Sequence, residues 1–304
     1  MKKHTLKDWF LATRPWSFPA SAMPIIVTVA FLFSKDAEIN WLMAVLALVG
    51  VVLFHTSGNL WSDYFDFKKK VDDVNTFGAT SLTTGQFQPN EIRNFALGVL
   101  VVSVLIGLTI LYFTGLTVLW IGIAGAVLML LYPQMKYNAL GDLAIIMTFA
   151  FLPTIGTSFV TTGAIDWSVL YVALPIGLIT DAILHSNNTR DMQSDKQAGI
   201  VTLAMSMGKK SAAWLYAFEV LFPFVWVIIC AIFGVFPRDF GMIGILFALP
   251  IALKNAKTML KGYGDTNAIA ALDKGTAQLQ LLFSLFLSLS FISDKLINLV
   301  FSLG

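Results

Sequence analysis

Long apolar runs separated by short polar stretches make up most of the 304-residue chain. A helix that crosses a bilayer needs roughly 20 mostly apolar residues, and nine runs meet or approach that length. They cover residues 17–34, 41–60, 94–114, 117–133, 141–160, 168–186, 212–234, 240–254 and 277–292. The eighth is short for a full span, and the ninth is expected to end near Ile292, before Ser293 and Asp294. The pattern predicts an all-α, polytopic membrane protein whose single transmembrane domain covers residues 1–304.

Composition supports this class of protein. The chain is 57% hydrophobic and only 12% charged, whereas a soluble domain carries about 25% charged residues. The net charge of +2 is too small to suggest a nucleic-acid partner. The one cysteine, Cys230, lies in an apolar run, which excludes a disulfide framework and a thiolate metal site. Residues 5–14 look amphipathic and are expected to lie at the membrane surface.

The distribution of lysine and arginine predicts the orientation. If the N-terminus lies inside, every Lys and Arg except Lys35, Arg238 and Lys295 falls in a cytoplasmic segment. Cytoplasmic loops of membrane proteins carry this excess of positive charge. We therefore expect the N-terminus and the long polar connections to face the cytoplasm.

Two of those connections are rich in carboxylates and carboxamides spaced three or four residues apart, so that the side chains share a helical face. The members of these acidic motifs are Asn59, Asp63 and Asp66 in the first, with Asp72 and Asp73 just beyond, and Asn188, Asp191 and Asp195 in the second. His55 shares the helical face of the first motif, and Asp181 and His185 share that of the second. Oxygen ligands of this kind suit Mg²⁺, which often reaches a substrate phosphate through one or two carboxylates. The simpler alternative is that these acids are merely solvated, but two such motifs on one side favour a metal–diphosphate site.

Other polar residues leave two interpretations open. An ionisable group inside a span, such as Asp181 or His185, usually faces a cavity or a partner, so these two form a polar pair between helices or act at an acceptor substrate. Tyr132 and Lys136 belong either to an ordinary turn or to a site that contacts diphosphate and stabilises a cation on aromatic faces. Arg14 is either an interfacial anchor or a substrate contact.

At these residues the chain resembles the UbiA-type intramembrane prenyltransferases. The resemblance implies nine transmembrane helices around a central cavity, and two aspartate-rich motifs that bind Mg²⁺ and a polyprenyl diphosphate. The implied metal ligands and catalytic groups are Asp63, Asp66, Asp191 and Asp195, with Lys136 as a further catalytic group. The candidate substrate-binding residues are Asn59, Asn188, Arg190, Tyr132, Arg14 and His185.

Within that family, residues 14–16, 82–85, 187–191 and 202–204 look most like the menaquinone-pathway branch. This implies transfer of the polyprenyl group to 1,4-dihydroxy-2-naphthoate with decarboxylation, giving demethylmenaquinol, at the bacterial cytoplasmic (inner) membrane. One alternative is another aromatic acceptor, 4-hydroxybenzoate or homogentisate. A cation-coupled transporter is a different class, but transporters more often place their sites near the bilayer midplane, whereas these acids crowd the cytoplasmic mouth.

Overall fold

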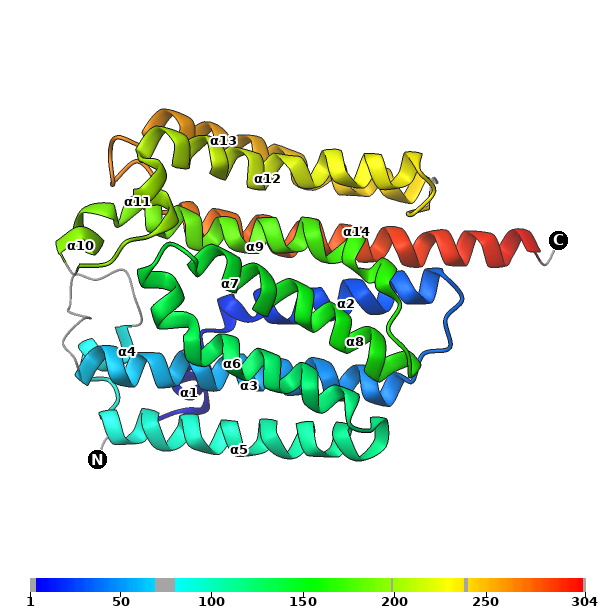
Figure 1. Ribbon diagram of the computed structural model, residues 1–304, viewed down its shortest axis with the longest axis horizontal. Coiled ribbons are helices and arrows are strands. Elements are labelled where there is room, and N and C mark those ends of the chain that lie inside the picture. Colours follow the sequence, from blue (N-terminus) through cyan, green and yellow to red (C-terminus); the bar gives the residue numbers. More distant parts are fainter. Residues whose placement is uncertain (1–3, 69–79, 198, 238–239, 303–304) are drawn as a thin grey trace.

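The computed structural model describes residues 4–68, 80–197, 199–237 and 240–302, and within them the chain is helical and contains no strand (Figure 1). The elements are α1 (Leu6–Ala12), η1 (Pro15–Ser17), α2 (Phe18–Ser34), α3 (Trp41–Lys68), α4 (Thr80–Thr83), α5 (Pro89–Thr114), α6 (Thr117–Tyr137), α7 (Gly141–Ile146), η2 (Met147–Phe151), α8 (Leu152–Thr162), η3 (Trp167–Val169), α9 (Leu170–Arg190), α10 (Met192–Gln197), α11 (Leu203–Met207), α12 (Lys209–Ile232), η4 (Phe240–Ala248), α13 (Leu249–Gly262) and α14 (Leu272–Ser302).

The predicted class is confirmed, and the predicted number of nine spans is approximately right. Among the described residues, eight helical segments are long and apolar enough to cross a membrane, and Thr117–Tyr132 is a ninth, shorter apolar helix. Each of the nine corresponds to one predicted run. The span Gly141–Thr162 is built from α7, η2 and α8. Its middle part, η2, is a π-helical turn, a feature that often marks functional sites.

Two predicted boundaries were wrong. Helix α14 does not end near Ile292 but continues to Ser302, because Lys295 forms an ion pair with Asp36 and its charge is satisfied without a break in the helix. The eighth span is not short, since it runs from Met242 to Gly262. There α13 buries Ala252, Asn255, Ala256 and Met259 at helical spacing, which lets its lysines occupy the other face.

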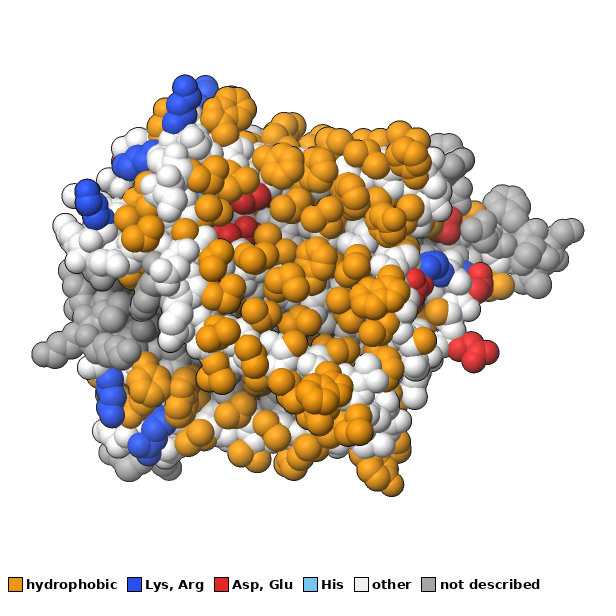
Figure 2. Space-filling model, in the orientation of Figure 1, with side chains coloured by type: hydrophobic (Ala, Val, Ile, Leu, Met, Phe, Trp, Pro, Cys, Tyr) orange, Lys and Arg blue, Asp and Glu red, His pale blue; other side chains and the backbone are white. Residues whose placement is uncertain are grey.

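Polar elements gather at one end of the bundle. Figure 1 shows α4, α10 and α11 at the same end as the N-terminus, while the C-terminus lies at the opposite end. The face in Figure 2 carries a broad apolar middle, and most of its Lys and Arg side chains lie at the end that holds α10. The charge asymmetry along the chain is therefore also an asymmetry in space.

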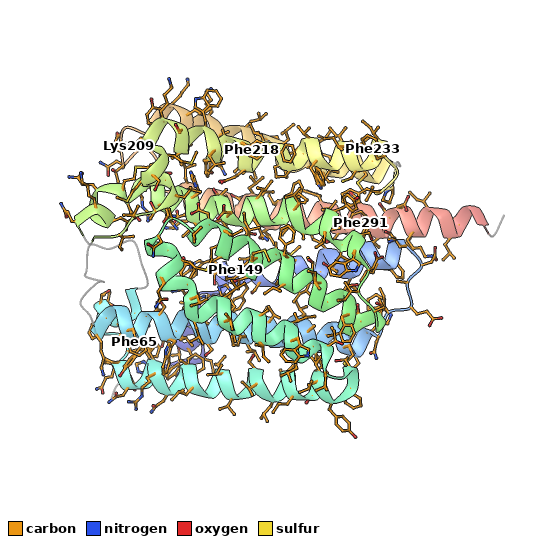
Figure 3. The ribbon with its side chains drawn as sticks, viewed as in Figure 1. Phe65, Phe149, Lys209, Phe218, Phe233 and Phe291 are labelled. Atoms are coloured by element: carbon orange, nitrogen blue, oxygen red, sulfur yellow. The ribbon has the colours of Figure 1, made fainter. Side chains whose placement is uncertain are left out.

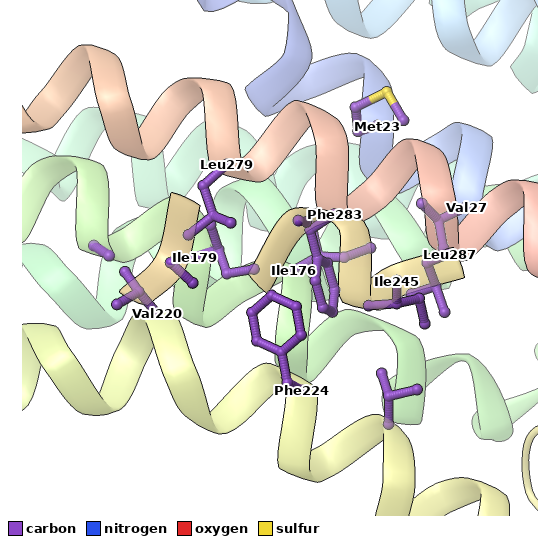
Figure 4. Close-up of a cluster of buried hydrophobic side chains, with 14 of the residues drawn as sticks. Met23, Val27, Ile176, Ile179, Val220, Phe224, Ile245, Leu279, Phe283 and Leu287 are labelled. Atoms are coloured by element: carbon purple, nitrogen blue, oxygen red, sulfur yellow. The ribbon is translucent and has the colours of Figure 1, made fainter. Parts of the chain in front are cut away.

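The main hydrophobic core joins α2, α9, α12 and α14 (Figure 4). Phe224 of α12 meets Phe283 of α14 edge-on, with ring centroids 5.2 Å apart, and Phe31 of α2 lies 5.2 Å from Phe291. Aromatic pairs of this kind contribute roughly 0.5–1.5 kcal/mol beyond burial. Inside a membrane such packing holds helices together, so this core fixes the helices that carry the second acidic motif.

Candidate active site

The first acidic motif lies on the face of α3 that meets η1 and α2. Asp63 is buried and forms an ion pair with Arg14. One turn earlier, the Nδ2 of Asn59 donates to Ser17 Oγ at 3.1 Å. One turn before that, His55 Nδ1 lies 3.0 Å from Ser21 Oγ. The four-residue spacing of these side chains thus places all three against the segment that begins with Arg14.

Arg14 reaches Asp63 from an unusual backbone conformation. Its φ of 55° is left-handed, which is unfavourable for a residue with a Cβ. The turn leads directly into η1, where Pro15 at the first position fixes the helical start. The guanidinium Nε of Arg14 is buried and has no hydrogen-bond partner among the described residues. The guanidinium therefore retains a donor that a ligand can use.

The second acidic motif lies where α9 ends. Arg190 holds Asp191 through two parallel hydrogen bonds of 2.7 Å, from Nε to Oδ1 and from NH2 to Oδ2. Its NH1 lies 3.6 Å from Asp273 on α14. The adjacent Asn188 is buried. Bidentate arginine–carboxylate pairs have a defined geometry, so Arg190 orients Asp191 at the end of α9.

Asp195, on α10, shares the electrostatic environment of Asp191 and Lys136. Burial raises the pKa of the Asp195 carboxyl above its ordinary value. The positive charge of Lys136 opposes this rise, whereas the negative charge of Asp191 adds to it. The structure thus brings Lys136, Asp191 and Asp195 into one electrostatic environment.

The position of Lys136 depends on a tight turn between α6 and α7. A Cβ added to Gly141 would lie only 3.2 Å from Lys136 Cα, so glycine allows the two segments to approach. The backbone N–H of Ala139 donates to Val201 O at 3.0 Å. This bond ties the turn to the segment that follows the second motif.

A cavity of about 180 Å³ opens between the helices. Its walls are largely apolar and include Trp16, His55, Phe149, Thr180, Leu184 and Gln280. Phe149 comes from the π-helical turn η2 and lies in the middle of the bundle in Figure 3, between the ends marked by Lys209 and Phe233. An apolar cavity with few polar groups is typical of a small-molecule site.

The described residues contain no group of three or more His, Cys, Asp and Glu side chains that could hold a metal ion by themselves. Mg²⁺ rarely needs such a cage, because it uses one or two carboxylates together with waters and substrate phosphates. Asp191 and Asp195 supply carboxylates, and the buried Asn187 Oδ1 has no partner in this part of the structure. These oxygens fit Mg²⁺ bound together with a diphosphate. The Asp66 side chain, Asp72 and Asp73 lie outside the described residues.

Two predicted site residues lie away from the motif carboxylates. His185 is fully enclosed, with Nδ1 3.1 Å from Asp142 Oδ1 and Nε2 3.0 Å from Ala212 O. Tyr132 is close enough to Asp142 and Asp181 to interact with their charges. A contact of His185 with substrate stays a prediction that this geometry does not support. Sequence reasoning missed Glu219 beside His185, although a lone acid within an apolar run is itself a signal.

Comparison with known proteins gives the family. The model of the UbiA prenyltransferase family matches residues 22–285. UbiA prenyltransferase domain-containing protein 1 of Xenopus tropicalis is 33% identical over 297 residues, which cover 93% of this chain and 81% of that protein.

Solved structures share the fold at low sequence identity. A UbiA homolog from Aeropyrum pernix K1 superposes with a TM-score of 0.64 at 14% identity, covering 91% of this chain and 97% of that one. A UbiA homolog from Archaeoglobus fulgidus bound to GPP and Mg²⁺ gives a TM-score of 0.55 at 14% identity, covering 94% and 99%. Because the family match spans most of its length, the chain belongs to the UbiA prenyltransferase family.

Proposed function

We propose that this prenyltransferase uses Mg²⁺ to transfer a polyprenyl group from its diphosphate to 1,4-dihydroxy-2-naphthoate, with loss of CO₂ and formation of demethylmenaquinol. The observation that carries the proposal is the pair of acidic motifs, each bearing an arginine-paired carboxylate, in a bundle that also contains an apolar cavity. Membership of a prenyltransferase family decides between the enzyme and the transporter in favour of the enzyme.

The proposed roles follow from the charges at each motif. Asp63 and Asp66 on one side, and Asp191 and Asp195 on the other, hold the metal. When bound, Mg²⁺ acts as a Lewis acid that draws electrons from the diphosphate. Its use here is supported by the Archaeoglobus fulgidus UbiA homolog, whose structure contains GPP and Mg²⁺.

The chain's own basic groups bind the substrates. Lys136 and Arg190 lie beside the second motif and are placed to neutralise the oxygens of the leaving diphosphate. Arg14, with its spare Nε donor, is the proposed partner of the acceptor's carboxylate, and Asn59 and Asn188 orient the ligands. The apolar walls of the cavity exclude water from the allylic cation, and the aromatic face of Tyr132 is the proposed stabiliser of its charge.

The end of the bundle that carries both motifs is proposed to face the cytoplasm, in the cytoplasmic membrane of a bacterium. The excess of Lys and Arg at that end supports this orientation (Figure 2). The charged diphosphate head group would then meet the site at the cytoplasmic surface of the membrane.

The test uses purified protein in detergent with Mg²⁺, polyprenyl diphosphates of several lengths and a panel of aromatic acids, with products identified by mass. We expect a prenylated, decarboxylated naphthoquinol that disappears when Mg²⁺ is chelated. Asp166→Asn is a matched control, because Asp166 pairs with Lys35 outside both motifs. Prenylation of 4-hydroxybenzoate or homogentisate alone would keep the enzyme class and overturn the proposed acceptor.

A further inference from the structure

Four titratable side chains meet inside the helical bundle, apart from both acidic motifs. They are Asp142 of α7, Asp181 and His185 of α9, and Glu219 of α12, and we refer to them as the inner cluster. All four lie within candidate membrane spans. The side chain of His185 is 0% exposed, that of Asp142 6% and that of Glu219 3%. Water therefore has almost no access to these charges.

Hydrogen-bond geometry fixes where one proton lies. His185 Nε2 is 3.0 Å from the carbonyl oxygen of Ala212, and a carbonyl only accepts, so Nε2 carries a hydrogen. His185 Nδ1 is 3.1 Å from Asp142 Oδ1, which requires one hydrogen between them. Imidazolium with carboxylate and imidazole with carboxylic acid both satisfy this contact, and in both the pair has no net charge.

The other two acids have no cation to balance them. Glu219 Oε1 lies 4.0 Å from His185 Nδ1, but that nitrogen is already engaged by Asp142. In the described part of the chain, neither Asp181 nor Glu219 forms an ion pair with Lys or Arg, and Asp181 Oδ1 and Glu219 Oε2 lack hydrogen-bond partners. The charges of Asp142, Asp181 and Glu219 would also repel one another.

The neighbouring elements supply no compensating charge among the residues that the structure describes. Tyr132 of α6 is close enough to Asp142 and Asp181 to interact with their charges. Tyr216 of α12 is close enough to interact with Glu219 and shares a 2.6 Å hydrogen bond with Thr276. Asp273, which also interacts with Tyr216, is itself acidic. Within the described residues, these four side chains are not arranged as a group of three or more metal ligands. A buried, unpaired carboxylate protonates rather than stay charged.

We propose that the inner cluster is an internal proton-binding site, in which Asp181 and Glu219 hold their protons at neutral pH and the His185–Asp142 pair shares one more. The site joins α7, α9 and α12 as an uncharged polar contact. Since α9 continues from His185 to Arg190, the same contact supports the base of the second motif. The inference concerns protonation alone, and it stands independently of the proposed reaction.

Infrared spectroscopy of the full-length protein in detergent at neutral pH tests the proposal. We expect the C=O stretch of protonated carboxylic acids in the wild type, shifted in D₂O, and reduced in both Glu219→Gln and Asp181→Asn. Asp166→Asn is the control, because the hydrogen bonds from Lys35 and Ser168 outweigh its partial burial and keep the pKa of Asp166 below its ordinary value. That variant leaves the band unchanged.

Stability gives a second readout. An amide has the shape of a protonated carboxyl, so Glu219→Gln and Asp181→Asn are expected to unfold at the wild-type denaturant concentration. Absence of an acid band in the wild type would overturn the proposal even if the variants fail to fold. A band that both variants leave intact would also overturn it, as would marked destabilisation of Glu219→Gln, which would show an ionised partner of His185.

Discussion

The ion pair between Arg14 and Asp63 gives the sharpest test of how the first motif is held before substrate binds. Arg14→Gln removes the positive charge but keeps a long polar side chain. The backbone strain at φ 55° is similar for both residues, because neither is glycine. A change in stability therefore reports the charge of the guanidinium rather than the turn.

The expected loss follows from burial. Removing one partner of a buried ion pair is destabilising by about 3–5 kcal/mol, because the other charge stays behind without compensation. The Asp63 side chain is 3% exposed and that of Arg14 is 25% exposed. Water can therefore enter part of the vacated space, and we expect Arg14→Gln to lose about 2–3 kcal/mol.

Denaturant titration of the detergent-solubilised protein measures this loss, with Lys35→Gln as the matched control. Lys35 pairs with Asp166 at 2.6 Å, but the two side chains are 40% and 33% exposed, so that variant is expected to lose at most about 1 kcal/mol. Adding Mg²⁺ together with a prenyl diphosphate should reduce the stability difference between Arg14→Gln and the wild type, because the metal supplies positive charge near Asp63. Equal losses in the two variants would refute the reasoning.

Further substitutions address the two motifs and the turn between α6 and α7. Asp63→Asn and Asp191→Asn are each expected to abolish prenyl transfer while membrane insertion and folding persist, and near-normal turnover of either purified variant would remove that carboxylate from the metal site. Lys136→Ala is expected to raise the Michaelis constant for prenyl diphosphate more than that for the acceptor, and unchanged constants would count against its role. Gly141→Ala would place a Cβ 3.2 Å from Lys136 Cα. This variant should lose about 1–3 kcal/mol of folding stability, and its Michaelis constant for prenyl diphosphate should also rise. Gly122→Ala, on α6 with open space around the added Cβ, is the control and should change neither the stability nor the Michaelis constant.

Features encoded by short stretches of sequence could be predicted from the sequence. The length of each apolar run is a local property, and all nine runs correspond to helices of the structure. The spacing of His55, Asn59 and Asp63 is equally local, and their contacts lie along one face of α3. The helical period alone determines which of these side chains share a face.

Partners far apart in the chain could not be predicted in this way. Arg14 and Asp63 are 49 residues apart, and His185 meets Asp142 across 43 residues. Nothing in either segment identifies its partner, because the packing of several helices brings them together. The predicted end of α14 was wrong for the same reason. Lys295 forms an ion pair with Asp36, which is distant in the sequence, and this contact allows the helix to continue through its polar residues.

The arginines at the two motifs also imply a rule for loading the site. Asp63 pairs with Arg14 and Asp191 with Arg190, so a cation that binds alone at either carboxylate must displace the guanidinium that pairs with it. A diphosphate that binds alone to the arginines must displace the carboxylates that pair with them. Bound together, the metal and the diphosphate can replace both members of each pair, and no buried charge is left uncompensated.

We therefore expect Mg²⁺ and prenyl diphosphate to bind with positive and reciprocal coupling. Calorimetric titration of each ligand with and without the other measures the coupling directly, and it needs no acceptor substrate and no turnover. Arg14→Gln should weaken the coupling, because Asp63 then accepts a cation without releasing the guanidinium of Arg14. Mg²⁺ affinity that is independent of prenyl diphosphate in the wild type would show that the two ion pairs are not exchanged on binding, and that the arginines are fixed parts of the folded site.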